Sequence, residues 1–148
     1  SLIAFLAEKG TFISPTLAVF EKQYPDSDSV EVNGFQNMLR FVGLAYKGGA
    51  KIVVGSHTWV PYADEGYAYF REMELLQDAG LTPMKIIEGA TLENARFLRI
   101  DERLGSIEEG KVADLVLVDG HPLSDIREMR NVKMVMLNGA WVGDQREQ

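Results

Sequence analysis

The stretch KIVVGSHTWVP, residues 51–61, constrains the fold of this chain most strongly. Its first half contains the run IVV (52–54), whose apolar β-branched residues suit a strand buried on both faces of a parallel sheet. The next residues, GSHT (55–58), are small and polar, and they lie at the end of a strand where α/β sheets and barrels place their chemistry. A helical pattern follows, so the order of strand, polar loop and helix predicts a parallel α/β architecture.

A second strand of the same kind is predicted earlier in the chain. Residues 11–17, TFISPTL, begin apolar and become polar at their end, where Pro15 cannot donate to a strand ladder. A helical stripe of apolar residues occupies 35–46, between the two runs. Because a strand, helix and strand connection in one sheet is right-handed almost always, we expect strands 11–16 and 51–56 to be parallel neighbours.

Further helices are predicted by apolar periodicity and by residues typical of helix ends. A short helix over residues 1–9 ends before Gly10, and another over 67–79 ends before Gly80. Thr82-Pro83 predicts the start of a third helix, and Thr91 predicts a cap for the segment 92–100. Residues 21–33 are polar and acidic and contain a proline, so we expect a solvated loop there.

The composition changes near residues 100–104, which is the single boundary that the sequence suggests. Beyond it, strands are predicted over 113–119 and 132–142, with the Asn138-Gly139 pair that a two-residue hairpin turn favours. We therefore expect one unit over residues 1–103 and a small β unit over residues 104–148.

Composition excludes several classes of function. The net charge is −7 and the pI is about 4.8, without a basic cluster, so a nucleic-acid partner is not expected. The chain has no cysteine, which excludes disulfides, thiolate nucleophiles and Cys-based zinc sites. The apolar stretches are far shorter than the roughly 20 residues that a membrane-spanning helix needs.

Three ordered stretches resemble the C-terminal third of the metal-dependent amidohydrolase superfamily, in its imidazolonepropionase-like and prolidase-like branch. These stretches are KIVVGSH, ELLQDAGLTPMKIIEGATLENARFL, and LGSIEEGKVADLVLVDGHPLSDI followed by VKMVMLNGAWV. The resemblance implies an α/β fold that is the C-terminal portion of a (β/α)8 TIM-type barrel plus part of a small composite β-sandwich. It also implies hydrolysis of C–N bonds with a divalent metal, zinc being expected.

His57 is where the sequence departs from this family's pattern. The family carries a metal-associated aspartate after Gly-Thr at the end of the last barrel strand, whereas this chain reads Gly55-Ser56-His57. An imidazole binds a divalent metal through a neutral nitrogen and acts as a general base near neutral pH, so His57 is our candidate metal ligand and catalytic residue. Thr16, Ser56 and Trp59 are candidate substrate contacts because they end or follow the two strands.

Two readings of the chain remain open. In the first, it is the C-terminal part of an amidohydrolase, inactive alone because a catalytic metal needs roughly three protein ligands and most would lie outside this chain. In the second, it is a non-catalytic scaffold or binding protein that has lost the aspartate.

The chain opens with Ser1 instead of Met, so we expect an excerpt from a longer protein. Half a barrel leaves sheet edges and apolar faces uncovered. We therefore expect a homo-oligomer or association with the missing barrel, a small amide or dipeptide-like substrate, and a cytoplasmic location unless a missing N-terminal part carries a signal.

Overall fold

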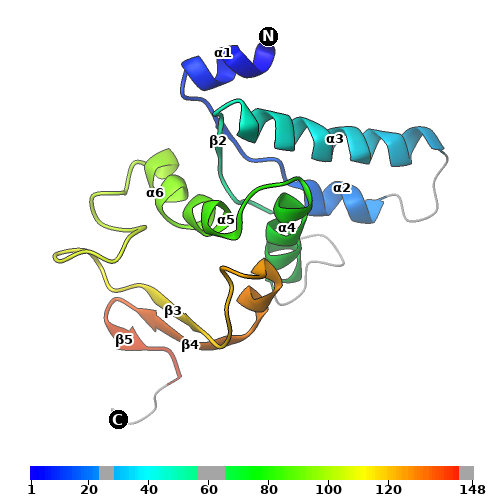
Figure 1. Cartoon of the computed structure of the whole chain (residues 1–148). Coiled ribbons are helices and arrows are strands. Elements are labelled where there is room, and N and C mark those ends of the chain that lie inside the picture. The colour runs from blue at the N-terminus through cyan, green and yellow to red at the C-terminus, as the bar shows by residue number, and fades with distance from the viewer. Residues whose placement is uncertain (24–28, 57–65, 144–148) are drawn as a thin grey trace.

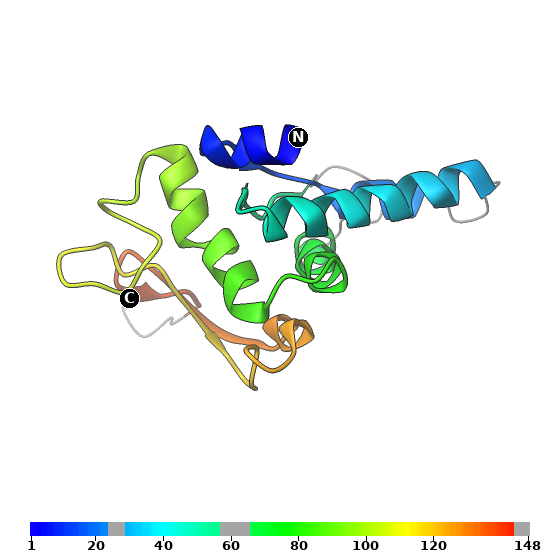
Figure 2. The ribbon, with the colours of Figure 1, turned by 45° about the horizontal axis from the view of Figure 1, so that its top comes forward.

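The computed structural model describes residues 1–23, 29–56 and 66–143. These residues form two sheets: a two-stranded parallel sheet with helices around it, and a three-stranded antiparallel sheet near the C-terminus (Figure 1). Helices α5 (Pro83–Ala90) and α6 (Leu92–Leu98) lie between this antiparallel sheet and the N-terminal helix in both ribbon views (Figure 2). No helix within these ranges is long and apolar enough to cross a membrane.

Strands β1 (Phe12–Ile13) and β2 (Lys51–Ile52) pair in parallel, with Phe12 opposite Lys51. The predicted parallel pairing is confirmed, but the ladder is shorter than the predicted spans 11–16 and 51–56. It stops because Pro15 has no N–H to donate and because the chain turns at Thr16, where φ is 51°. The buried run of β2 continues beyond the ladder, since the Val53 N–H still donates to the Ile13 carbonyl at 2.9 Å.

The N-terminal helices are α1 (Leu2–Glu8), α2 (Leu17–Gln23) and α3 (Ser29–Lys47). The predicted loop over 21–33 is therefore wrong at both ends, because residues 21–23 complete α2 and residues 29–33 begin α3. Polarity alone does not exclude a helix that buries one face: α2 buries its first three residues, and α3 buries residues from its second half. Pro25 lies outside the described residues.

Three helices follow β2: α4 (Tyr67–Asp78), α5 (Pro83–Ala90) and α6 (Leu92–Leu98). Gly80 follows α4 with φ of 99°, and the Thr82 side chain caps α5 by accepting from the Lys85 N–H, so both predicted ends are confirmed. Thr91 is the N-cap of α6, as predicted, but its side chain makes no capping hydrogen bond. Its hydroxyl donates to the Ile87 carbonyl at 2.7 Å, because α6 continues almost directly from α5.

The C-terminal sheet is a meander of β3 (Leu115–Val118), β4 (Val132–Leu137) and β5 (Ala140–Trp141). Asn138 and Gly139 have φ of 49° and 83°, which confirms the predicted two-residue hairpin turn. A 3-10 helix, η2 (Ile126–Arg130), connects β3 to β4 and buries Ile126 against the same core as α4.

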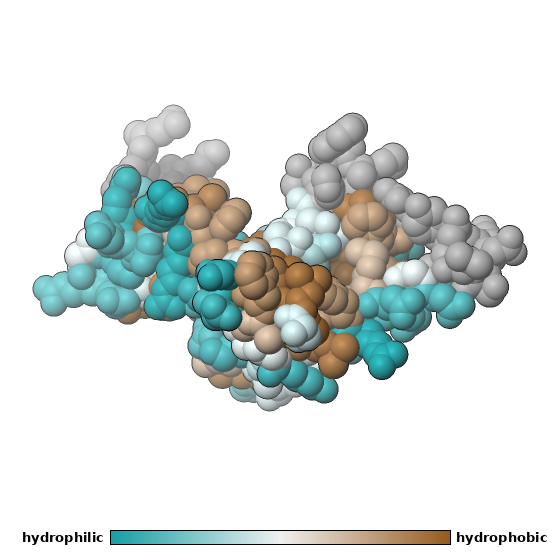
Figure 3. Space-filling model, turned by 90° about the horizontal axis from the view of Figure 1, so that it is seen from above, coloured by the Kyte–Doolittle hydropathy of each residue, from teal (hydrophilic) through white to brown (hydrophobic). Residues whose placement is uncertain are grey.

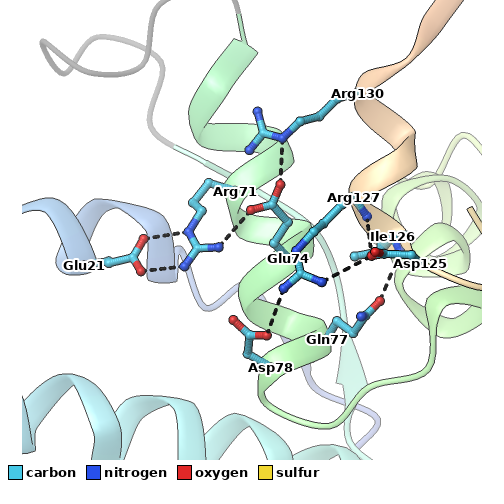
Figure 4. Close-up of polar contacts among 9 residues, drawn as sticks. All are labelled: Glu21, Arg71, Glu74, Gln77, Asp78, Asp125, Ile126, Arg127 and Arg130. Carbon is cyan, nitrogen blue, oxygen red and sulfur yellow. Dashed lines mark hydrogen bonds and ion pairs between the residues drawn. The ribbon is translucent and has the colours of Figure 1, made fainter.

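Helix α4 joins the two ends of the chain through ion pairs (Figure 4). Arg71 binds Glu21 of α2 at 2.7 Å and Glu74 at 2.8 Å, and Arg130 of η2 binds the other oxygen of Glu74 at 2.6 Å. Burial alone would raise the pKa of Glu74, but the hydrogen bonds and charges of the two arginines outweigh it and lower that pKa. The network fixes η2, and with it the start of β4, against α4.

Several apolar side chains stay uncovered on the described surface. Figure 3 shows apolar residues at the centre of the face seen from above, the side on which α1 lies. In α1 the exposed fractions are 63% for Leu2 and 55% for Phe5, and Leu44 of α3 is 47% exposed. Trp141 and Leu137 are likewise exposed on the antiparallel sheet. Apolar faces of this kind are typical of surfaces that another element covers.

Gly43 lies at a close approach between α3 and the residue that follows α4, because a Cβ there would collide with the Ala79 carbonyl oxygen. We predict that Gly43→Ala lowers the free energy of unfolding by about 1–3 kcal/mol through overpacking. Gly34 is the matched control in the same helix, with nothing within 4 Å of an added Cβ. Gly34→Ala should raise stability by about 0.5–1 kcal/mol through helix propensity. Urea denaturation measures the free energy of unfolding of both variants. Equal changes in the two variants would contradict a close contact at Gly43.

Candidate functional site

The candidate site is the edge at which β1 and β2 both end. Parallel strands place their carboxyl ends at one edge. Ser14 follows β1 directly, and Gly55 and Ser56 come after the buried Val53 and Val54 that extend β2. The two segments converge closely, since a Cβ added at Gly55 would lie 2.6 Å from the Ser14 hydroxyl oxygen. Only glycine at position 55 leaves room for this approach without displacing Ser14.

The structure places two of the four predicted site residues on this edge. Thr16 follows β1, Ser56 follows β2, and both are half-buried. His57 and Trp59 lie outside the described residues, so their predicted roles as metal ligand, base and substrate contact stay predictions. His57 directly follows Ser56 in the sequence. The second histidine of the chain, His121, is exposed.

Two hydrogen bonds from α5 and α6 hold the backbone of Val54, just beyond β2. The Val54 N–H donates to the Gly89 carbonyl at 3.1 Å, and the Val54 carbonyl accepts from the Asn94 side-chain amide at 2.8 Å. Helix α5 approaches β2 so closely that a Cβ at Gly89 would lie 2.9 Å from the Ile52 carbonyl oxygen. These contacts fix the backbone just before Gly55 and Ser56.

Asn94 therefore offers a test of how this edge is held. We predict that Asn94→Asp lowers the free energy of unfolding by about 1–3 kcal/mol, because a carboxylate cannot donate to the Val54 carbonyl and would face its lone pairs. Asn37 of α3 is exposed and serves as the control, since Asn37→Asp should change stability by less than about 0.5 kcal/mol. Urea denaturation measures the stability of the two variants. An unchanged free energy of unfolding in Asn94→Asp would show that the contact does not hold the strand end.

Glu72 is the residue at this edge that the sequence did not reveal. It is fully buried on α4, and its Oε2 accepts from the Ala18 N–H at 2.8 Å. Burial raises the pKa of Glu72 to about 7, although the backbone amides of Ala18, Leu17 and Thr16 oppose the shift. The usable signal was spacing, because Glu72 lies one helical turn from the buried residues Ala68 and Leu76.

Glu72 and Glu74 bind different partners, so their carboxyl groups do not form a pair. Glu72 binds a backbone amide of α2, whereas Glu74 binds two arginines. Within the described ranges, no group of three His, Cys, Asp or Glu residues could hold a metal ion. The described residues therefore do not by themselves fit a divalent metal, and any such ion needs ligands from elsewhere.

Comparison with known proteins places this geometry in a wider context. A family model described as the amidohydrolase family matches residues 3–142. Adenine deaminase 4 of Rhizobium meliloti (strain 1021) is 40% identical over 60 residues, which are 40% of this chain and 9% of that protein. Imidazolonepropionase of Picrophilus torridus is 41% identical over 61 residues, covering 39% of this chain and 16% of that protein.

The structural likeness extends over almost the whole chain. The solved structure of a Xaa-Pro dipeptidase with bound methionine in the active site matches with a TM-score of 0.75 and 30% identity. The match covers 94% of this chain and 36% of the dipeptidase. This chain thus spans about a third of the length of that relative, and far less of the two curated proteins.

Proposed function

Because the chain belongs to the amidohydrolase family, as its motifs predicted, we propose that it is the C-terminal portion of a metal-dependent enzyme that hydrolyses C–N bonds in small molecules. The substrate class in this proposal is an amide, an imide or a dipeptide-like compound. The observation that carries it is the match of one family model to residues 3–142, with a fold similar to a dipeptidase over 94% of the chain.

In this proposal, residues 1–103 are the last βα units of a (β/α)8 barrel and residues 104–148 are part of a composite β-sandwich. The parallel β1–β2 pair, with the buried run 52–54 and polar residues beyond both strands, supports the barrel assignment. The uncovered apolar side chains of α1, α3 and the antiparallel sheet support association with the rest of the barrel, or with another copy, as an essential step in folding. A cytoplasmic location is part of the proposal and rests on the sequence alone.

His57 is the residue of this chain to which we assign the chemistry. A divalent metal, zinc in this proposal, would be held mostly by residues outside the chain, because the described residues offer no metal-binding group. Such an ion supplies a polarised water for hydrolysis. His57 would contribute one neutral nitrogen or accept one proton, and either role requires the unprotonated imidazole. Thr16, Ser56 and Trp59 would contact the substrate around it.

A non-catalytic scaffold is the second candidate function, and one specific feature favours it. The position that carries an aspartate in the family motif carries His57 here, so the negative charge of that position is absent. A protein that has lost hydrolysis would keep the same fold and the same buried contacts. The presence or absence of a bound metal in the full-length protein distinguishes the two functions.

We predict that His57→Ala in the full-length protein lowers bound zinc and hydrolysis together, whereas His57→Asp keeps the metal and shifts the pH profile. The shift follows because a carboxylate ionises near pH 4 and an imidazole loses its proton near pH 6.5. Metal content is measured by mass spectrometry, and hydrolysis with a panel of acyl-amino-acid, lactam, cyclic-imide and Xaa-Pro substrates. His121→Ala is the matched control, since its exposed side chain should affect neither. Unchanged metal in both His57 variants would remove His57 from the metal site, and a full-length protein without bound metal would favour the scaffold.

A further inference from the structure

Thr16 adopts a backbone conformation that β-branched residues avoid. Its φ of 51° lies in the left-handed region, where a residue with a branched side chain is strained by roughly 1–3 kcal/mol. The strained residue joins Pro15 to the first residue of α2, at the edge that holds the candidate site. Such strain persists only where the surrounding structure enforces it.

The acceptor at the start of α2 comes from a distant side chain. A threonine that precedes a helix normally takes an extended backbone and caps the helix with its own hydroxyl. Here Glu72, 54 residues away, accepts from the N–H of Ala18, the second residue of α2. The Thr16 hydroxyl makes no hydrogen bond to the residues that the structure describes. The carboxylate of Glu72 therefore caps α2 in place of the Thr16 hydroxyl.

The environment of Glu72 indicates that its role is to hold the backbone of residues 16–18. Its side chain is fully buried, and the charged groups nearest to it in the chain are engaged elsewhere: Arg71 binds Glu21 and Glu74. Its second oxygen, Oε1, has no partner among the described residues. A buried carboxylate without a cation is costly, and among the described residues the backbone amides of Thr16, Leu17 and Ala18 stabilise it.

We propose that Glu72 is a positioning residue, whose carboxylate holds the backbone at Ala18 and so presents the Thr16 hydroxyl at the strand edge for substrate. This inference rests on the proposed function for the binding step, since Thr16 is a candidate substrate contact there. The holding step stands on the hydrogen bond and on the conformation of Thr16 alone. Glu72 thus links α4 to the site without touching the substrate.

The test compares Glu72→Ala, which removes the acceptor, with Glu72→Gln, which keeps one oxygen, in the full-length protein. Hydrogen exchange of the peptide covering residues 14–20 should become at least about tenfold faster in Glu72→Ala, with the remainder of the protein unchanged, and Glu72→Gln should restore protection. Should Glu72→Ala fail to fold, Glu72→Asp, which is one methylene too short to reach Ala18, replaces it. Unchanged exchange in residues 14–20 would overturn the holding step.

The binding step is measured as KM and kcat on the most active Xaa-Pro or acyl-amino-acid substrate. Glu72→Ala should raise KM about tenfold with kcat changed less than about twofold, and it should have little further effect in a Thr16→Val background. Additive effects of the two substitutions would overturn positioning through Thr16. If the protein hydrolyses nothing in the panel, the proposed function fails. Hydrogen exchange then tests by itself whether Glu72 holds the backbone of residues 16–18.

Discussion

The position of the site depends on how the backbone of residues 52–54 is hydrogen bonded on both of its sides. Val53 donates to Ile13 of β1, and Val54 donates in the opposite direction to Gly89 of α5. The strand end is therefore fixed between a strand and a helix. This arrangement needs a glycine in α5, since any side chain at position 89 would meet the Ile52 carbonyl. The residues that carry the candidate chemistry follow immediately after this fixed segment.

Helix α4 supports the same edge through two buried carboxylates, those of Glu72 and Glu74, which are stabilised in different ways. Glu74 is neutralised by Arg71 and Arg130, so its pKa falls and it holds η2 in place. Burial outweighs the backbone amides that Glu72 accepts from in the described part of the chain, so its pKa rises to about 7. One charge fixes the C-terminal segment, while the other holds the turn after β1. The two strand ends are thus held by α4, α5 and α6 together.

Much of this arrangement could be predicted because short-range signals determine it. Gly80, the Thr82-Pro83 pair and the Asn138-Gly139 turn each fix a local conformation that their side chains specify, and each was found as predicted. The parallel pairing was predicted from two apolar runs in the sequence with a predicted helix between them. The helices over 21–23 and 29–33 were missed because polar residues were taken for a loop. The burial of Glu72 was missed because a carboxylate on a helix normally faces water, and its partner lies 54 residues away.

The position of a bound metal in a crystal of the full-length protein tests the central claim most directly, namely that the joint end of β1 and β2 is the site of chemistry. An anomalous difference map at the zinc absorption edge locates the ion without assumptions about activity. The account predicts a peak beyond Thr16 and Ser56, with a nitrogen of His57 at about 2.1 Å. A metal peak elsewhere, with His57 directed away from the strand ends, would contradict it.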